Sequence, residues 1–302
     1  MKRFISRLKN QSPLQKQPGT MSRQVGAPWQ PGAALDNGPP PPPYAAPETN
    51  QYSRSNMRAH EADPFYFLYL FDTVLLIDDS SSMLGRRWRE VQAALRQLAP
   101  VCTSHDDDGI DLYFMNHCSD GPGAPMGCAA TRPPGGKAPW GYYNVTDAST
   151  IETIFNSLRP CGPTPTHDRL RHIIDPYMAQ LRAAPSPLDV RPLNIIVLTD
   201  GRPGPELPNG VNPQDPLPLI VHYAHALDSM GAPLYQLGIQ FIQVGDDAGA
   251  TAALEALDKL RGGFRDIVDT TKYDGGDGPL TADGILKAVL GGVDKRLDDD
   301  AG

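Results

Sequence analysis

The stretch Phe71-Asp72-Thr73-Val74-Leu75-Leu76-Ile77-Asp78-Asp79-Ser80-Ser81-Ser82 joins an apolar run to a cluster of acids and hydroxyls. The apolar part suits a strand buried on both faces of a parallel sheet. Asp78, Ser80 and Ser82 then fall at alternate positions where that strand should end. Ligands of α/β proteins bind at the carboxyl ends of parallel strands. These hard oxygen atoms therefore indicate a bound divalent cation.

Strand and helix patterns alternate from about residue 66 onward. Further strands are expected at 109–115, 141–145 (a short edge strand), 193–198, 239–244 and 265–269, and helices at 88–98, 147–158 (capped by Asp147 or Ser149), 166–182, 217–230, 248–260 and 282–297. Such alternation predicts an α/β fold with a Rossmann-like, doubly wound, mostly parallel sheet.

The composition divides the chain into a tail and a globular region. Residues 1–62 are rich in proline and polar residues and are predicted to be a disordered tail, whereas 66–297 form one domain and 298–302 an acidic tail. The 302-residue chain has a net charge of −8, which argues against a general nucleic-acid binder.

Targeting signals are weak. The four cysteines show no CxxC spacing, the first nine residues lack an apolar signal core, and no apolar run is long enough to span a membrane. We therefore expect a cytoplasmic protein with free thiols. Phe4, Ile5 and Leu8 beside basic residues would support at most weak peripheral contact with an anionic membrane, and a frayed tail is the favoured reading.

The tail contains Pro41-Pro42-Pro43-Tyr44, which fits the PPxY pattern that WW domains bind. Polyproline II segments are already extended, so binding them costs little conformational entropy. The alternative is a plain proline-rich linker.

Two more loops carry oxygen ligands. Thr164 lies in Gly162-Pro163-Thr164-Pro165-Thr166, and Asp200 follows the strand expected at 193–198. Loops at the carboxyl ends of parallel strands share one edge of the sheet, so we expect these residues to meet Asp78. Each residue alone has a simpler explanation as a cap or turn residue. Together they favour a Mg²⁺ site, with Mn²⁺ as the alternative, and the lack of His and Cys disfavours zinc.

The motifs Asp-x-Ser-x-Ser, Gly-x-Thr-Pro-Thr and Thr-Asp-Gly, in this order, resemble the metal-ion-dependent adhesion site (MIDAS) of von Willebrand factor A (vWA) domains. The resemblance implies an antiparallel edge strand in the sheet and helices on both faces. It implies direct ligation by Ser80, Ser82 and, in the ligand-bound state, Thr164, with Asp78 and Asp200 acting directly or through water. Asp79 and Ser81 would point away. The chain is most similar to intracellular members, including a fungal group with a proline-rich leader.

Other candidate sites are weaker. His222 and His225 lie three residues apart on an expected helix, but packing or surface roles are favoured because no third ligand is evident. The long loop at 117–140 is expected to bind something or to be disordered. Arg202 is the basic residue expected beside the ligand motifs, as an anion clamp or as a solvated surface residue.

Three functions remain open. The first is an intracellular adaptor, not an enzyme, that captures an Asp or Glu of a protein partner through Mg²⁺. The second is a metal-dependent hydrolase or phosphatase. The P-loop, the Gly-x-Ser-x-Gly elbow and the His-Glu-x-x-His motif are all missing from the sequence. The third is a scaffold with a purely structural metal site.

Overall fold

The computed structural model describes residues 70–105, 109–125, 128, 133, 135–258, 264–273, 281 and 284–286. The chain divides into two units, Met1–Ala46 and Pro47–Gly302, and the described residues all belong to the second. The predicted tail at 1–62, with its Pro41-Pro42-Pro43-Tyr44 motif, lies outside the described residues, as does the acidic tail at 298–302.

The described residues form strands and helices in alternation. The strands are β1 (Asp72–Ile77), β2 (Ile110–Phe114), β3 (Tyr142–Val145), β4 (Leu193–Thr199), β5 (Leu237–Val244) and β6 (Val268–Tyr273). The helices are α2 (Arg86–His105), α3 (Ala148–Ser157), α4 (Thr166–Ala183), α5 (Leu217–Ser229) and α6 (Ala248–Asp258), with short 3₁₀ turns at Ser81–Met83, Pro187–Asp189 and Leu234–Gln236.

One sheet with the order β3-β2-β1-β4-β5-β6 organises the described residues. β1 lies at its centre, parallel to β2 and β4, and the parallel pairing continues to β5 and β6. β3 is antiparallel to β2 at the edge. The predicted fold class, a mostly parallel doubly wound sheet with one antiparallel edge strand, is confirmed.

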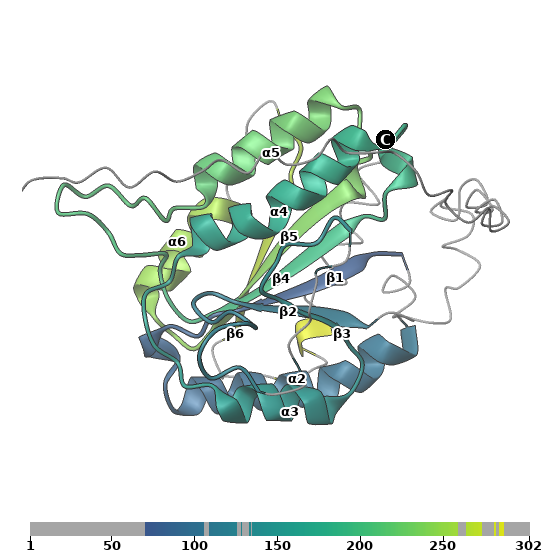
Figure 1. Ribbon diagram of the computed structural model, residues 1–302. Helices are drawn as coiled ribbons and strands as arrows, with labels where there is room; N and C mark the ends of the chain where they lie inside the picture. The colour runs from purple at the N-terminus through teal and green to yellow at the C-terminus, as the bar shows by residue number, and fades with distance from the viewer. Residues whose placement is uncertain are drawn as a thin grey trace, which may run out of the picture. The chain divides into compact units, whose positions relative to one another are not determined.

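Helices cover both faces of the sheet (Figure 1). α2 and α3 pack on one face, and the core there includes Val91, Leu95 and Phe155. α4, α5 and α6 pack on the opposite face. β1 contributes to both cores because its side chains alternate between the faces, which explains why residues 74–77 are all apolar.

Most predicted element boundaries agree with the structure to within a few residues. Asp147 is the N-cap of α3 and accepts a 2.8 Å hydrogen bond from the backbone N–H of Thr150. α2 extends to His105, well past the predicted end at residue 98, with Pro100 inside it. Of the predicted last helix, residues 284–286 are described and are helical.

The prediction for the last strand was wrong in position. A strand was expected at 265–269, whereas β6 runs from Val268 to Tyr273. Arg265 instead belongs to a loop, where it pairs with Asp228 at 2.7 Å and donates to the carbonyl oxygen of Ala232. The strand continues through polar residues because an edge strand has only one neighbour and tolerates them.

Candidate metal centre

The ends of β1 and β4 place two carboxylates next to each other. The strands are parallel neighbours, with Ile77 in register with Leu198. The backbone N–H of Asp78 donates to the carbonyl oxygen of Leu198 at 2.8 Å, which extends the pairing past the end of β1. Asp78 and Asp200 therefore emerge from adjacent strands at the same edge of the sheet, as expected for the carboxyl ends of parallel strands.

Asp78 is fully buried, and hydrogen bonds engage both of its carboxylate oxygens. Oδ1 accepts a 2.8 Å hydrogen bond from the backbone N–H of Ser80, and Oδ2 accepts a 2.6 Å hydrogen bond from the hydroxyl of Thr199. Burial raises the pKa of Asp78 to about 6, although these hydrogen bonds oppose the rise. No ion pair to Asp78 is found in the part of the chain that the structure describes.

A chain of hydroxyls connects Ser80 to Asp200. The Ser80 and Ser82 hydroxyl oxygens lie 3.0 Å apart, and Ser82 donates to Asp200 Oδ1 at 2.7 Å. Asp200 and Ser80 are buried, whereas Ser82 is exposed. The carboxylates of the cluster are therefore buried, and the cluster reaches solvent at Ser82.

Thr164 joins the same edge through backbone contacts of its loop. The N–H of Cys161 donates to Asp79 O at 2.7 Å, and the N–H of Gly204 donates to Thr164 O at 3.0 Å. A Cβ atom placed on Gly201 would lie 3.8 Å from Ser82 Oγ and 4.0 Å from Thr164 Oγ1. The two hydroxyls therefore face one small region above Gly201.

The structure thus brings all five of the ligands predicted from the sequence to one edge of the sheet: Asp78, Ser80, Ser82, Thr164 and Asp200. Asp79 and Ser81, which alternate with Asp78, Ser80 and Ser82 in the sequence, make other contacts. Asp79 is buried and accepts hydrogen bonds from the backbone N–H groups of Asn116 at 2.7 Å and His117 at 2.9 Å. The Ser81 hydroxyl donates to Gly162 O at 3.3 Å.

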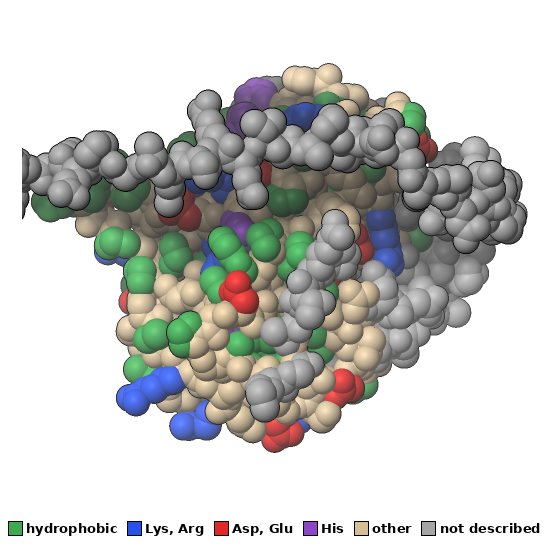
Figure 2. All heavy atoms as spheres, in the orientation of Figure 1, with side chains coloured by type: hydrophobic (Ala, Val, Ile, Leu, Met, Phe, Trp, Pro, Cys, Tyr) green, Lys and Arg blue, Asp and Glu red, His purple; other side chains and the backbone are tan. Residues whose placement is uncertain are grey.

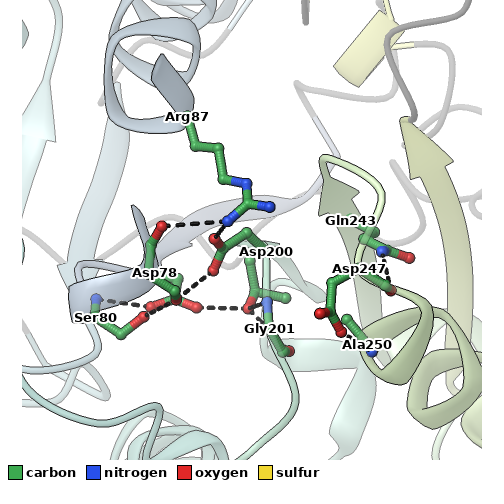
Figure 3. A network of polar contacts seen from close by, with 10 residues as sticks. Asp78, Ser80, Arg87, Asp200, Gly201, Gln243, Asp247 and Ala250 are labelled. Atoms are coloured by element: carbon green, nitrogen blue, oxygen red, sulfur yellow. Dashed lines mark hydrogen bonds and ion pairs between the residues drawn. The ribbon is translucent and has the colours of Figure 1, made fainter. Parts of the chain in front are cut away.

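Sequence reasoning missed Arg87, a basic residue at the centre of the cluster. Its Nη1 lies 2.6 Å from Asp200 Oδ2 and also donates to the carbonyl oxygen of Ser82 at 3.3 Å. Figure 3 shows the guanidinium reaching from α2 onto Asp200, with Asp78 and Ser80 close by. Arg202, the basic residue next to the ligand motifs in the sequence, is exposed, as the favoured surface role predicts, and Arg87 is the basic residue that contacts a predicted ligand. One signal was available, because a basic residue in the first turn of a helix opposes the helix dipole.

The donor set fits a hard divalent cation. It consists of two carboxylates and three hydroxyls, and all of them are oxygen donors. Asp78 holds a buried carboxylate without a basic partner in the described part of the chain, so a cation would supply missing positive charge. Among those same residues no three His, Cys, Asp or Glu side chains cluster, so hydroxyls would have to complete the coordination.

A cavity of about 450 Å³ adjoins the cluster. It is lined by Thr199, whose hydroxyl donates to Asp78, and by Gly201, and it extends toward the N-terminal side of α5 and the face of α6. Apolar side chains such as Phe241 and Leu254 form part of its wall, and Arg202 and Glu206 add charge. Its volume lies in the range of ligand-binding clefts.

The other candidates show packing contacts. His222 lies beside Tyr223, with ring centroids 5.5 Å apart, and His225 lies beside Phe264 at 5.3 Å. In the described part of the 117–140 loop, Trp140 is 46% exposed and stacks on His172 at 5.0 Å. Cys118, Cys128 and Cys161 are free thiols. No described helix is long and apolar enough to cross a membrane.

Comparisons with known proteins show a distant likeness in fold. No family model matches the chain, and no curated protein matches it. Two solved structures of proximal thread matrix protein 1 from the mussel byssus, one with a zinc-occupied MIDAS motif, are each 15% identical with a TM-score of 0.38, and cover 74% of this chain and 47% of theirs. The human COPII-coat protein Sec24c is 14% identical with a TM-score of 0.37, and the match covers 76% of this chain and 32% of that one.

The chain therefore spans less than half the length of each of these three structures. At such low identities and TM-scores the likeness carries no argument about function. The description of the fold depends on the strand order and pairing given above.

Proposed function

We propose that this chain is an intracellular protein-binding adaptor of the vWA type, whose metal centre captures a carboxylate of a partner protein. The observation that carries the proposal is the arrangement of Asp78 and Asp200, which are buried next to the exposed residue Ser82. Such a site holds its negative charge out of water and offers one accessible side. It suits a cation that the buried carboxylates hold on one side and that a ligand from solvent reaches on the other.

The five residues Asp78, Ser80, Ser82, Thr164 and Asp200 would hold the cation, with Mg²⁺ as the expected ion and Mn²⁺ as the alternative. A divalent ion bound there would offer a coordination position to an Asp or Glu of the partner. The two carboxylates would balance the charge of a divalent ion, and the Arg87 guanidinium in contact with Asp200 would leave the loaded cluster with a charge of +1. An incoming carboxylate would neutralise that charge.

The adjoining cavity supports a partner segment longer than one acidic side chain. Its lining includes Thr199 and Gly201, the sequence neighbours of Asp200, and Leu217 and Leu254 contribute apolar surface to it. Arg202, Glu206 and Asp215 give its wall mixed charge, so apolar contacts would hold the segment there. We therefore assign the cavity to an apolar side chain of the same partner segment, next to the acidic residue that reaches the cation.

We expect no catalytic turnover. Hydrogen bonds or the Arg87 ion pair engage every oxygen of Asp78 and Asp200, and none of the described groups that contact these oxygens is a histidine or cysteine. Histidine is the commonest general acid or base, and in the described part of the chain none contacts the oxygens of Asp78, Asp200 or Ser82. A phosphatase screen in Mg²⁺ tests this expectation: turnover that disappears in Asp78→Ala would replace the adaptor by a hydrolase.

The tail would supply a second interaction. Pro41, Pro42 and Tyr44 form the PPxY pattern, so we propose a WW-domain protein as the tail's partner. This residue set lies outside the described residues, and the proposal depends on the sequence alone.

The adaptor function is tested by affinity purification from the native host in Mg²⁺ and in EDTA. Ser82→Ala and Ser81→Ala make a matched pair, because both serines are exposed and adjacent but only Ser82 contacts Asp200. A metal-bridged partner should be recovered in Mg²⁺ by the wild type and by Ser81→Ala. It should be lost in EDTA, in Ser82→Ala and in Asp200→Ala. Recovery that ignores both EDTA and Asp200→Ala would refute the metal bridge, whereas a purely structural metal would give no Mg²⁺-dependent partner.

A further inference from the structure

We propose that Arg87 is a built-in competitor of the cation at this site, which weakens metal binding until an anionic ligand arrives. The inference concerns the same metal centre and therefore rests on the proposed function. It adds a regulatory role for a residue outside the predicted ligand set. Arg87 would balance the charge of Asp200 in the free site and would couple the binding of the cation to the binding of the partner's carboxylate.

The contacts of Asp200 are the first part of the argument. Its side chain is 0% exposed, Arg87 Nη1 lies 2.6 Å from Oδ2, and Ser82 donates to Oδ1 at 2.7 Å. Both oxygens are therefore already engaged. A cation that uses Asp200 must displace Arg87 or share the carboxylate with a positive charge at contact distance, and either event costs binding free energy.

The position of Arg87 in α2 is the second part. Arg86 and Arg87 both lie in the first turn, where the positive end of the helix dipole disfavours basic residues. Arg86 extends into solvent, with 78% of its side chain exposed, and pairs with Glu90 on the same helix. Arg87 turns inward instead and is 32% exposed. The contact with Asp200 therefore offsets an unfavourable helix position.

The end of β5 makes room for this side chain. Gly245 has φ of +87°, and a Cβ atom there would lie 2.9 Å from Arg87 Nε. Any other residue would crowd the guanidinium and strain the backbone. Two strand ends thus adapt to Arg87: β4 supplies its charge partner, and β5 leaves the space that it occupies.

The charges predict coupled binding. Asp78 and Asp200 contribute −2 when ionised and Arg87 contributes +1, so the free cluster carries −1 and a cluster with a divalent ion carries +1. A carboxylate would return the loaded cluster to neutrality. Arg87 therefore disfavours the ion alone and favours the ion together with an anion. Because such coupling is reciprocal, the ion would strengthen carboxylate binding by the same factor.

The test is a calorimetric titration of Mn²⁺ into the full chain with and without acetate as the carboxylate probe. The variants are Arg87→Met, Arg87→Lys and the control Arg86→Met, which removes a neighbouring basic residue with no contact to Asp200 among the described pairs. Without acetate, Arg87→Met should bind Mn²⁺ about tenfold more tightly than the wild type, which corresponds to 1.4 kcal/mol. Arg87→Lys and Arg86→Met should stay within about threefold of the wild type.

Acetate should tighten Mn²⁺ binding by the wild type more than by Arg87→Met. Thermal unfolding gives a second readout: Mn²⁺ should raise the Tm of Arg87→Met more than that of the wild type, because that variant leaves Asp200 buried without its basic partner. The rise in Tm on addition of Mn²⁺ can be measured even if Arg87→Met is poorly folded in EDTA.

The outcomes separate this inference from the proposed function. Measurable Mn²⁺ binding with equal or weaker affinity in Arg87→Met overturns the competitor role and leaves the metal site intact. Binding by Arg87→Lys as tight as that by Arg87→Met also overturns it, because positive charge would then not matter. If neither the wild type nor Arg87→Met binds Mn²⁺, both the competitor role and the proposed metal centre fail.

Discussion

Asp78 and Asp200 are the same residue type in neighbouring positions, yet their charges are handled differently. Asp78 is surrounded by the N–H of Ser80 and the hydroxyl of Thr199, and its pKa rises to about 6 because burial outweighs those hydrogen bonds. Asp200 has a guanidinium in contact. Positive charge is therefore available on one side of the free site and lacking on the other.

The raised pKa of Asp78 predicts a pH dependence of stability in the metal-free protein. The folded pKa of about 6 lies above the ordinary value of 3.8, so the folded state binds more protons than the unfolded state between these pH values. The free energy of unfolding contributed by Asp78 therefore falls as the pH rises from about 4 to about 6 and stays low above that. Asp78→Asn should remove this loss and be more stable at pH 7 by about 2–3 kcal/mol.

Urea unfolding in EDTA at pH 4, 5, 6 and 7 measures this difference. The curves of wild type and Asp78→Asn should diverge between pH 4 and 6 and run parallel above pH 6. Parallel curves over the whole range would show that burial does not perturb Asp78.

The sequence could predict the five candidate ligands because each belongs to a short local motif next to an apolar strand. Arg87 could not be found in this way. Its ion pair joins residues 113 positions apart, and it depends on the residue at which α2 begins and on the space beside Gly245. Tertiary contacts of this kind have no local sequence pattern, although the helix dipole marks Arg87 as an unusual choice.

At the scale of elements, the buried parallel strands were the most predictable parts. Residues 74–77 of β1 and 195–198 of β4 are continuous apolar runs, because both faces of the sheet are covered by helices. β6 was displaced by three residues at its start, because polar residues of an edge strand do not give the same pattern. The end of α2 was missed because the apolar residues at helical spacing stop at Leu98, whereas the helix continues through Pro100 to His105.

The cavity between α5 and α6 allows a test of the proposed partner segment. Ala253 of α6 is partly buried and lies in the cavity wall. Ala253→Trp should fill part of the cavity and weaken capture of the Mg²⁺-dependent partner about tenfold or more, because an apolar side chain of the partner would lose its place.

Calorimetric titration of Mn²⁺ serves as the control, and it should give the same affinity for Ala253→Trp and wild type. The exposed Ala252→Trp, one position earlier on α6 and outside the cavity lining, is the matched variant. Partner recovery that is equal in all three proteins would contradict the assignment of the cavity to the partner.

At the scale of the whole molecule, a net negative charge is combined with exposed apolar side chains on the described residues. The chain has a net charge of −8, and exposed apolar side chains include Leu84, Leu207 and Val211. Figure 2 shows apolar side chains spread over the described part of one face, with few acidic ones between them. Leu207 and Val211 belong to the same 200–216 segment that contributes to the cavity.

The two proposed interactions should be separable. A chain that begins at residue 63 should bind Mn²⁺ and the metal-dependent partner as the full chain does, because all five candidate ligands lie beyond that point. It should lose binding to WW domains, and Tyr44→Ala in the full chain should do the same. Fluorescence titration with an isolated WW domain measures this effect, and binding retained by Tyr44→Ala would remove the tail from the proposal.

The backbone contacts between the strand-end loops have one more consequence. Asp79 is tied to Cys161, Ser81 to Gly162 and Gly204 to Thr164 by hydrogen bonds of 2.7, 3.1 and 3.0 Å. The hydroxyls and carboxylates of the centre are thereby fixed relative to one another before any ligand arrives. These loops are already ordered in the folded protein, so binding a partner costs little further conformational entropy in them. A rigid receptor of this kind distinguishes partners by shape and charge and gains little from adapting to each of them.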